Sequence, residues 1–349
     1  MNFSSWKGDL SEEIAKLQEV ALGEHSIRLV ALNSRIALGL PKKRDLADGV
    51  LKLYRPMKFR ARVMAWCLRA GIFFGLHQFL GKSFKGSGAP AVSWLKNSES
   101  IGFLGCNPSH GIRCVFLDRN RDGVNRVTKV AIGAGHNSLE NEGEQLAILS
   151  GKFEGIPKLG GTEKGTDWTA LWTKHYAVPG PRAMEAAVVV PLLEGWLGST
   201  SVRLGEVELL IPVLEEASPD LAKVIRKQVV RRALVHGDFT PWNLRWDGDQ
   251  LMAIDWEWGC EEGVSGLDLG HGLVMEGHLV GKLSGVELVD SVLKKAECRE
   301  IDKYLRESGW TNLEVWLSLV FLQSGITVGC DFQKELEVLV SKLKSQNII

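Results

Sequence analysis

Two short stretches of the sequence combine residue types that can carry chemistry. Residues 234–243 read Leu-Val-His-Gly-Asp-Phe-Thr-Pro-Trp-Asn, so that Asn243 follows Asp238 by five positions. Residues 252–257 read Met-Ala-Ile-Asp-Trp-Glu, in which Asp255 ends an apolar run. A carboxylate can orient a hydroxyl group and accept its proton. An amide oxygen and a second carboxylate supply the hard oxygen ligands that Mg²⁺ prefers. Transfer of a phosphoryl group from a nucleotide requires this set of side chains.

The elements around these stretches are predicted to bring the two acidic centres together. An apolar run before the first stretch predicts a short buried strand that delivers it to a loop. Residues 244–254 predict two strands around Asp247-Gly248, a dipeptide that is a strong hairpin signal. Because the two ends of a hairpin meet, the residue after the second strand should return to the start of the first. We therefore expect Asp255 to lie close to Asn243.

These residues resemble the signatures of the aminoglycoside phosphotransferase and choline kinase group, the small-molecule branch of the protein-kinase-like fold. The His-Gly-Asp-x-x-x-x-Asn block and the Ile-Asp-Trp-Glu block carry the resemblance. It implies that Asp238 is the catalytic base and that Asn243 and Asp255 bind Mg²⁺. His236 belongs to the same catalytic block, where it is expected to hold the loop by hydrogen bonds.

Helical spacing upstream of these blocks indicates a second pair of residues, Lys129 and Glu142. A strand that carries Lys129 is predicted just before a helix that starts at Asn137, with Glu140 three residues later, and ends near Leu149. One face of this helix is apolar, and it includes the leucines at positions 139, 146 and 149. Glu142 falls on that same face.

A carboxylate that faces a core is costly unless a cation meets it, and Lys129 is the natural partner of Glu142. The resemblance implies that Lys129 binds the nucleotide phosphates and that Glu142 positions it. A structural ion pair without a ligand is the alternative. Glu140 and Glu144 fall on other faces of the helix and are expected to be solvated.

We expect an α+β chain with a two-lobed protein-kinase-like fold. Residues 1–90 form an N-terminal extension, partly helical, with a helix from Ser11 to about Leu22 and a linker at its end. Residues 91–176 form a small β-rich N-lobe that binds nucleotide, and residues 177–349 form a larger helical C-lobe with the catalytic and acceptor-binding residues.

Two segments of the predicted lobes have a hypothetical nucleotide role. The turn at residues 106–111 lies between two predicted strands and suits a flap over phosphates, although a plain hairpin has the same pattern. Residues 178–181, Val-Pro-Gly-Pro, interrupt the chain and are the candidate hinge between the lobes.

Composition excludes some classes of protein. Lys and Arg number 42, and Asp and Glu also number 42, so we expect no nucleic-acid partner. The six cysteines show no Cys-x-x-Cys spacing, and His271 and His278 lack the spacing of a zinc site. A reducing, cytoplasmic location is expected from the cysteines and from an N-terminus without the pattern of a signal peptide.

Residues 57–80 allow two interpretations. The segment is apolar, but Arg60, Arg62 and Arg69 make it too charged for a membrane span. It would suit contact with a membrane surface, with Trp66 and several phenylalanines in the headgroup region. We favour the other interpretation, an ordinary helix that packs on the kinase core.

The predicted reaction is transfer of the γ-phosphoryl group of ATP, or of GTP, to a hydroxyl of a small molecule. A sugar, an aminoglycoside-like compound and an amino alcohol remain open as acceptors, because a fold does not fix its substrate. A quaternary amine would need an aromatic cage, for which the tryptophans at 242, 256 and 258 are available. An aminoglycoside would need an acidic pocket, which the carboxylates at 257, 261, 262 and 268 could supply.

Two alternatives to a small-molecule kinase differ in class. One is a catalytically silent pseudokinase that serves as a nucleotide-binding or scaffolding module. The other is a protein kinase, which is disfavoured because no Asp-Phe-Gly or Ala-Pro-Glu segment is present. The sequence leaves the oligomeric state open.

Overall fold

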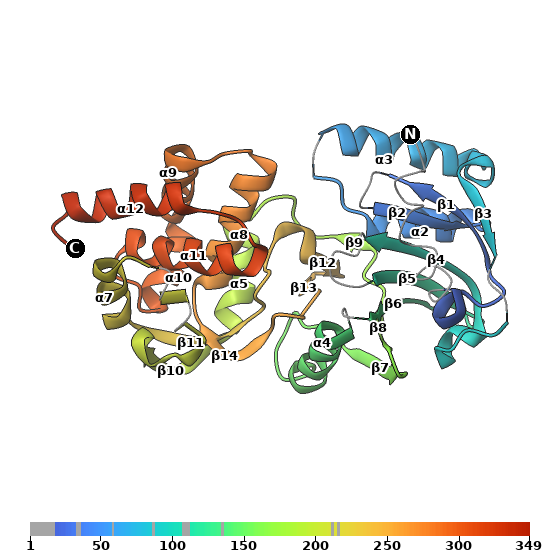
Figure 1. The fold of residues 1–349 in the computed structure, drawn as a ribbon, viewed down its shortest axis with the longest axis horizontal. Helices are drawn as coiled ribbons and strands as arrows, with labels where there is room; N and C mark the ends of the chain where they lie inside the picture. Colours follow the sequence, from blue (N-terminus) through green and yellow to red (C-terminus); the bar gives the residue numbers. More distant parts are fainter. Residues whose placement is uncertain are drawn as a thin grey trace. The chain divides into compact units, whose positions relative to one another are not determined.

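The chain divides into two units that are described separately (Figure 1). The computed structural model describes residues 18–32, 36–57, 59–85, 88–106, 112–133, 136–210, 213–214 and 217–349. The first unit comprises residues 1–150 and 157–177, and the second comprises residues 151–156 and 178–349. The last passage between them, from Ala177 to Val178, falls at the start of the segment predicted as a hinge.

The first unit is built on an antiparallel sheet. Within the described residues the sheet has eight strands in the order β3-β1-β2-β4-β5-β6-β8-β7. The strands are β1 (Ser26–Ala31), β2 (Ile36–Pro41), β3 (Lys82–Lys85), β4 (Ser98–Cys106), β5 (Ile112–Asn120), β6 (Asn125–Ile132), β7 (Leu159–Lys164) and β8 (Trp168–Lys174). Strands β1 to β3 come from the predicted extension, and β2 joins them to β4 through pairs such as Gly39 with Phe103.

The linker predicted at residues 82–90 is wrong for its first part, because β3 pairs with β1 at the edge of the sheet. Strand β1 would otherwise present unpaired backbone N–H and C=O groups, and β3 satisfies them. Lys82 and Lys85 end this edge strand, where charged side chains discourage further strand pairing.

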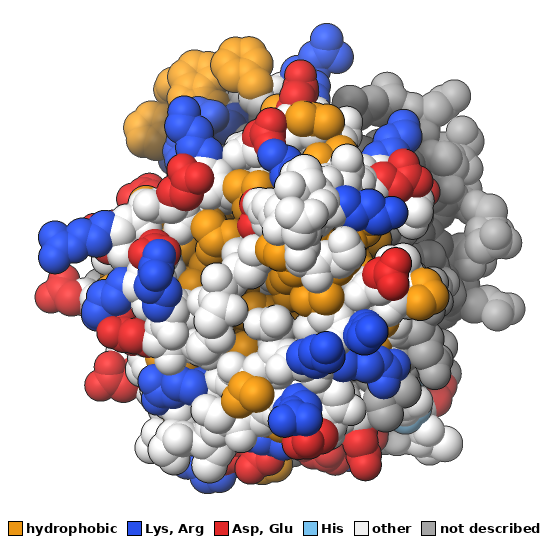
Figure 2. Space-filling view, turned by 90° about the vertical axis from the view of Figure 1, so that its left-hand side faces the viewer, with side chains coloured by type: hydrophobic (Ala, Val, Ile, Leu, Met, Phe, Trp, Pro, Cys, Tyr) orange, Lys and Arg blue, Asp and Glu red, His pale blue; other side chains and the backbone are white. Residues whose placement is uncertain are grey.

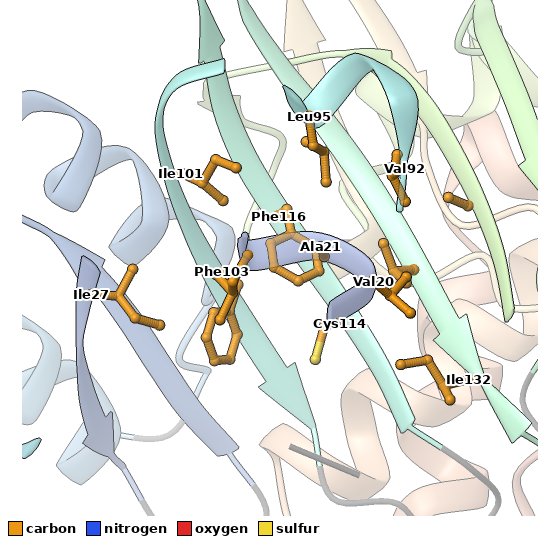
Figure 3. Close-up of a cluster of buried hydrophobic side chains, with 13 residues drawn as sticks. Val20, Ala21, Ile27, Val92, Leu95, Ile101, Phe103, Cys114, Phe116 and Ile132 are labelled. Atoms are coloured by element: carbon orange, nitrogen blue, oxygen red, sulfur yellow. The ribbon is translucent and has the colours of Figure 1, made fainter. Parts of the chain in front are cut away.

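Alternation along the strands gives the sheet two apolar faces. On one face, Phe103, Phe116 and Val130 pack with Val20 and Leu95, as Figure 3 shows in part. Val20 belongs to a π-helical turn at Gln18–Leu22, the end of the helix predicted from Ser11. The start of that helix, and the predicted flap turn at residues 107–111, lie outside the described residues.

The opposite face of the sheet carries helices. Helix α2 (Arg44–Leu53) packs Leu46 and Val50 against Leu38 and Leu117, and α3 (Phe59–Phe73) joins the same cluster. Helix α4 (His136–Leu149) packs Leu139 against Ala131 and Leu171. Helix α4 starts one residue before the predicted Asn137, within the usual uncertainty of a helix end.

The second unit is mainly helical. Its helices are α5 (Ala186–Gly195), α7 (Pro219–Lys227), α8 (Leu267–Met275), α9 (Gly285–Ala296), α10 (Arg299–Glu307), α11 (Leu313–Val328) and α12 (Gln333–Ser345). Its strands are β9 (Val178–Pro179), β10 (Leu197–Arg203), β11 (Val229–Val235), β12 (Leu244–Asp247), β13 (Gln250–Ala253) and β14 (Cys260–Val264). They form two sheets, β10-β11-β14 and β13-β12-β9.

Local sequence signals explain the ends of several of these elements. Ser218 caps α7, where its Oγ accepts a hydrogen bond from the N–H of Leu221 at 3.4 Å. That helix ends at Lys227, and Arg231 and Arg232 belong to β11. The predicted hairpin is confirmed, with Asp247 opposite Gln250 across its turn.

The α+β class is confirmed, with a β-rich unit followed by a helical unit that carries the catalytic blocks. The predicted order of elements, a strand with Lys129, a helix with Glu142 and then a catalytic loop and hairpin, is also observed. In the part of the chain that the structure describes, no helix combines the length and apolar character needed to cross a membrane.

Candidate active site

The loop that carries Asp238 is fixed by a buried aspartate on another element. Strand β11 ends at Val235, and the next two backbone N–H groups, those of His236 and Gly237, donate to the Asp268 carboxylate at 2.7 and 2.9 Å. Asp268 lies in the first turn of α8 and is 4% exposed. Asp268 therefore braces the start of the loop that carries Asp238.

The steric fit of Gly237 and the electrostatics of Asp268 both affect the contact between Asp268 and the loop. Gly237 has a φ of +84°, and a Cβ there would lie 2.5 Å from the Cβ of Trp258, so a larger residue does not fit. Burial raises the pKa of the Asp268 carboxyl, while His236 and the two N–H donors act in the opposite direction. The loop conformation therefore depends on a residue far away in the sequence.

His236 is fully buried and links the two catalytic blocks. Its Nδ1 accepts a hydrogen bond from the Asp238 N–H at 3.3 Å, which leaves Nε2–H to donate to the Ile254 carbonyl at 2.9 Å. Its ring packs on Trp256, with the centroids 4.7 Å apart. Both nitrogens serve the backbone, so His236 acts by positioning the loop, as the resemblance implied.

Both carboxylate oxygens of Asp238 have a partner. Oδ2 accepts from the Asn243 side-chain nitrogen at 2.9 Å, and that nitrogen also lies 3.0 Å from the Asp238 carbonyl. Oδ1 lies 3.1 Å from Nε2 of His271. The Asp238 side chain is 28% exposed, so its carboxylate is oriented by the protein but still reaches solvent. A group that must meet an external hydroxyl needs both properties.

The hairpin brings the second acidic centre to Asn243, as predicted. The N–H of Ile254 donates to the Asn243 carbonyl at 2.8 Å, and Asp255 follows directly. Asp255 has a φ of +77°, a left-handed conformation that costs a non-glycine residue about 1–3 kcal/mol. Strain of this kind gathers at functional sites, and aspartate tolerates it better than most residues.

The donor set around the hairpin fits Mg²⁺. The Asn243 side-chain nitrogen is engaged with Asp238, while its amide oxygen makes no hydrogen bond within the described part of the chain. Together with the Asp255 carboxylate it offers two hard oxygen ligands. The described residues contain no group of three or more His, Cys, Asp or Glu suited to a metal ion. A magnesium ion here would complete its shell with water and phosphate oxygens, which is its usual habit.

In the first unit, Lys129 and Glu142 form the predicted ion pair. The Lys129 Nζ lies 2.6 and 2.7 Å from the two carboxylate oxygens of Glu142. Glu142 is 3% exposed, on the apolar face of α4, and the Lys129 side chain is 17% exposed. The pairing is confirmed, and its role in holding phosphates stays a prediction. Glu144 is exposed as expected, but Glu140 is half-buried against Lys164 and Thr169.

The six predicted site residues therefore form two sets, each assembled within its own unit. Lys129 and Glu142 belong to the first unit. His236, Asp238, Asn243 and Asp255 belong to the second.

His271 is a site residue that sequence reasoning missed, because it was considered only as a zinc ligand. It is 4% exposed on α8, with Nε2 on Asp238 and Nδ1 2.9 Å from the Oγ of Ser324, which is fully buried. One signal could have found it. Asp268 and His271 are three residues apart on one helix, so a helix that braces the loop through the first presents the second to the same loop.

The two predicted acceptor walls do not form as expected. Trp256 is fully buried, packs on Trp196, and donates its indole N–H to the Ala253 carbonyl at 2.7 Å, so it cannot line an aromatic cage. Glu261 pairs with Lys152, and Glu262 lies 3.5 Å from Arg232. Glu261 and Glu262 are therefore each matched by a cation.

A cavity of about 210 Å³ adjoins the catalytic loop inside the second unit. Apolar side chains supply most of its wall. Its polar lining comes from Gln323, Ser324, Thr327, His271 and Asp268. Trp258, 54% exposed, also lines it. Because His271 also contacts Asp238, this cavity is the candidate acceptor pocket.

Comparison with known proteins places the catalytic blocks in a kinase-like context. The RIO domain family matches residues 166–260, a segment that contains Asp238, Asn243 and Asp255 but less than half of the chain. No curated protein sequence matches the chain.

Several solved structures are similar to parts of the chain. One is the aminoglycoside phosphotransferase APH(3'')-Id from Streptomyces rimosus in complex with ADP and streptomycin, with 17% identity, coverage of 61% of this chain and 90% of that chain, and a TM-score of 0.41. Another is a thermostable mutant of the aminoglycoside phosphotransferase APH(4)-Ia with ADP and hygromycin B, with 13% identity, coverage of 70% and 93%, and a TM-score of 0.41. A third, from Thermobifida fusca, is named as a fructosamine-3-kinase, with 17% identity, coverage of 68% and 92%, and a TM-score of 0.40.

Proposed function

We propose that this chain is a kinase that transfers the γ-phosphoryl group of ATP or GTP to a hydroxyl of a small molecule. The hydroxyl oxygen attacks the γ-phosphorus, the bond to the bridging oxygen breaks, and the nucleoside diphosphate leaves. Asp238 orients the hydroxyl and accepts its proton. Lys129, held by Glu142, binds the nucleotide phosphates. Asn243 and Asp255 would hold Mg²⁺, which when bound neutralises charge on the phosphates.

One observation carries the proposal. The side chain of Asn243 bonds the Asp238 carboxylate, while its carbonyl accepts from the residue before Asp255. Asn243 therefore ties the candidate base to the candidate metal ligand. A loop whose polar residues merely turned the backbone would have no need to hold one acidic residue by the Asn243 side chain and bring a second, in a strained conformation, next to the Asn243 main chain.

His271 is proposed as a positioning residue for Asp238. If its Nε2–H donates to Asp238 Oδ1, its Nδ1 accepts the Ser324 hydroxyl proton, and the neutral ring satisfies both contacts. The Asp238 carboxylate then has one amide donor and one imidazole donor, and it cannot rotate without losing one of them.

The lining of the cavity favours an uncharged, polyhydroxylated acceptor over a polycation. Among the described lining residues the one carboxylate is Asp268, and both of its oxygens already accept backbone N–H groups. The amide and hydroxyl groups of Gln323, Ser324 and Thr327 match hydroxyl groups on a ligand. On the face shown in Figure 2, Lys and Arg are interspersed with Asp and Glu, so no field of one sign covers that face.

The test is release of ADP by the full chain with Mg²⁺, measured across hexoses, amino alcohols and aminoglycosides. The key variant is Asp255→Asn, because asparagine also tolerates a positive φ and a loss of turnover then reflects the lost charge. We expect turnover to fall at least about 100-fold, with the thermal midpoint unchanged. Asp249→Asn, an exposed carboxylate on the turn of the same hairpin, is the matched control and should leave turnover intact.

Each outcome of this test separates the alternatives. Undiminished turnover by Asp255→Asn would contradict the assignment of the metal ligand. Nucleotide binding in a thermal-shift assay without ADP release on any acceptor would instead identify a pseudokinase. Turnover on aminoglycosides alone would overturn the preference for an uncharged acceptor and leave the phosphotransferase proposal in place.

A further inference from the structure

Helix α3 has its apolar side turned to the outside. Phe59, Val63, Trp66 and Phe73 are 75%, 46%, 70% and 72% exposed. They are spaced four, seven and fourteen residues from the first, so they share one face of the helix. A surface helix of a globular protein normally presents polar residues on this side. An exposed apolar stripe of this kind indicates an interaction surface.

The inward side of α3 fixes this orientation. Leu68 and Ile72 are buried in the cluster that α2 forms on the sheet. Arg69 Nε lies 2.9 Å from Asp48 Oδ1, and the Arg44 guanidinium donates to the Phe73 carbonyl at 3.3 Å. The helix therefore cannot roll to bury its aromatic stripe without losing these contacts.

The apolar surface continues past the end of the helix. Phe74, Leu76 and Phe79, in the turn that follows α3, are 68%, 54% and 81% exposed. Figure 2 shows a group of large apolar side chains at its upper margin, with Lys and Arg side chains beside them. We call the exposed side chains of residues 59–79 the aromatic face.

The segment that carries the aromatic face is basic and contains no acidic residue, although Arg69 pairs with Asp48 of the preceding helix. Residues 49–98 contain nine Lys and Arg and no Asp or Glu, although the whole chain is electrically balanced. Arg62 and Arg69 lie along one border of the stripe, and Arg60 lies along the other. Arg60 and Arg62 make no ion pair with any residue that the structure describes. A basic border along an apolar stripe is complementary to a surface with negative charge over an apolar interior.

We infer that the aromatic face docks the protein on an anionic phospholipid bilayer. The aromatic rings enter the boundary between headgroups and acyl chains, and the arginines reach lipid phosphates from the borders. Helix α3 has 15 residues and is too short to span a bilayer, but this length suits a helix that lies in the interface. A second copy of the chain fits less well, because a two-fold contact would bring one basic border against another without an acidic residue in α3 to offset it.

The experiment is flotation of the full chain with vesicles. We expect binding to vesicles of phosphatidylcholine with about one-third phosphatidylglycerol, and at least about 25-fold weaker binding to phosphatidylcholine alone. Phe59→Glu/Trp66→Glu should abolish binding to both. Arg60→Gln/Arg62→Gln should weaken binding to the anionic vesicles about 25-fold at low salt, at about fivefold per arginine, and should leave the weak binding to neutral vesicles unchanged.

The matched control is Val124→Glu/Ile148→Glu, which adds the same two charges at exposed apolar positions of the same unit, 54% and 45% exposed. It should bind like the wild type, and all variants should keep the wild-type thermal midpoint. Equal loss in the control would show a general charge effect and overturn the proposal. The proposal also fails if the wild type binds no vesicle, or if it elutes as a dimer that Phe59→Glu/Trp66→Glu dissociates while vesicle binding is absent.

Discussion

The two sets of candidate site residues, one in each unit, are held by different means. In the first unit, Lys129 and Glu142 sit on a strand and the next helix, 13 residues apart, and the apolar cores of those elements fix them. In the second unit, Asp238 sits on a loop whose geometry depends on Asp268, His271 and, through His271, Ser324. These contacts span 31 to 53 residues of sequence.

Because of this difference, we expect the ion pair to contribute mainly to the stability of the first unit, and the loop contacts mainly to the orientation of Asp238. The ion pair is buried, so damage to it should appear mainly as lost stability of the first unit. The Asp238 carboxylate is partly open to solvent and is oriented by directional hydrogen bonds, so damage to it should appear mainly as a lost rate. Substitutions in each set can test whether this division holds.

The largest effect is expected from Asp238→Asn. The new amide cannot accept the proton of the acceptor, so kcat should fall roughly 10²–10⁴-fold. One oxygen remains to accept a hydrogen bond, and the thermal midpoint should stay close to that of the wild type. ADP release and thermal unfolding measure the two effects, with Asp249→Asn as the control. A large loss of stability with little loss of rate would contradict the expectation that the loop contacts mainly orient Asp238.

The second effect concerns the buried pair. Lys129→Met removes the cation that faces the buried Glu142 carboxylate, and the first unit should lose about 3–5 kcal/mol in its free energy of unfolding. The double variant Lys129→Met/Glu142→Leu should recover most of that stability, because no charge is left buried. Nucleotide binding should stay lost in both variants. Urea unfolding measures the first result, and nucleotide titration measures the second.

Glu144→Gln is the control for this pair, since Glu144 lies on the same helix and is exposed. It should change neither stability nor nucleotide binding. If the double variant binds nucleotide as well as the wild type, the ion pair is structural alone. That result would leave the proposed role of Asp238 intact, but it would contradict the proposed role of Lys129 in binding the nucleotide phosphates.

The same division explains what could be predicted from the sequence. Glu142 was found because helical periodicity places it on the leucine face of α4, and a buried carboxylate needs a cation. The hairpin was found because Asp247-Gly248 suits its turn. These signals are local, so one stretch of sequence contains them. They predicted the α+β class, the pairing of Lys129 with Glu142 and the approach of Asp255 to Asn243, which are observed, while the roles of the six site residues stay predictions.

The remaining features depend on contacts that no local pattern encodes. His271 reaches Asp238 across 33 residues, and its spacing from Asp268 indicates that contact only once Asp268 is known to brace the loop. The burial of Trp256 depends on Trp196, which comes from another element. The edge strand β3 has a polar sequence typical of a linker and becomes a strand because β1 offers it partners. The outward direction of α3 likewise follows from which of its faces α2 covers.

Substitution of His271 should have a smaller effect on the rate, and it tests whether contacts from distant residues orient Asp238. His271→Ala removes one of the two side-chain donors to Asp238, and kcat should fall roughly 10- to 100-fold, since small errors of position are costly in rate. His271→Gln places an amide N–H near the position of Nε2 and should recover much of the rate. The KM for nucleotide should not change in either variant. Equal loss in both variants, or a parallel rise of this KM, would indicate a merely structural role.

The smallest effect is expected at the hairpin turn, where Gly248 has a φ of +61°. A Cβ at this position meets no atom within 4 Å, so Gly248→Ala should cost only the backbone strain, about 1 kcal/mol. Gly248→Asn should cost less, because asparagine tolerates this conformation. Urea unfolding gives the stability, and ADP release gives the rate. Because Ile254, the residue before Asp255, is also held by the Asn243 carbonyl and by His236, kcat should change little. If Gly248→Ala lowers kcat as much as His271→Ala does, the hairpin turn sets the geometry of Asp238, and long-range bracing does not.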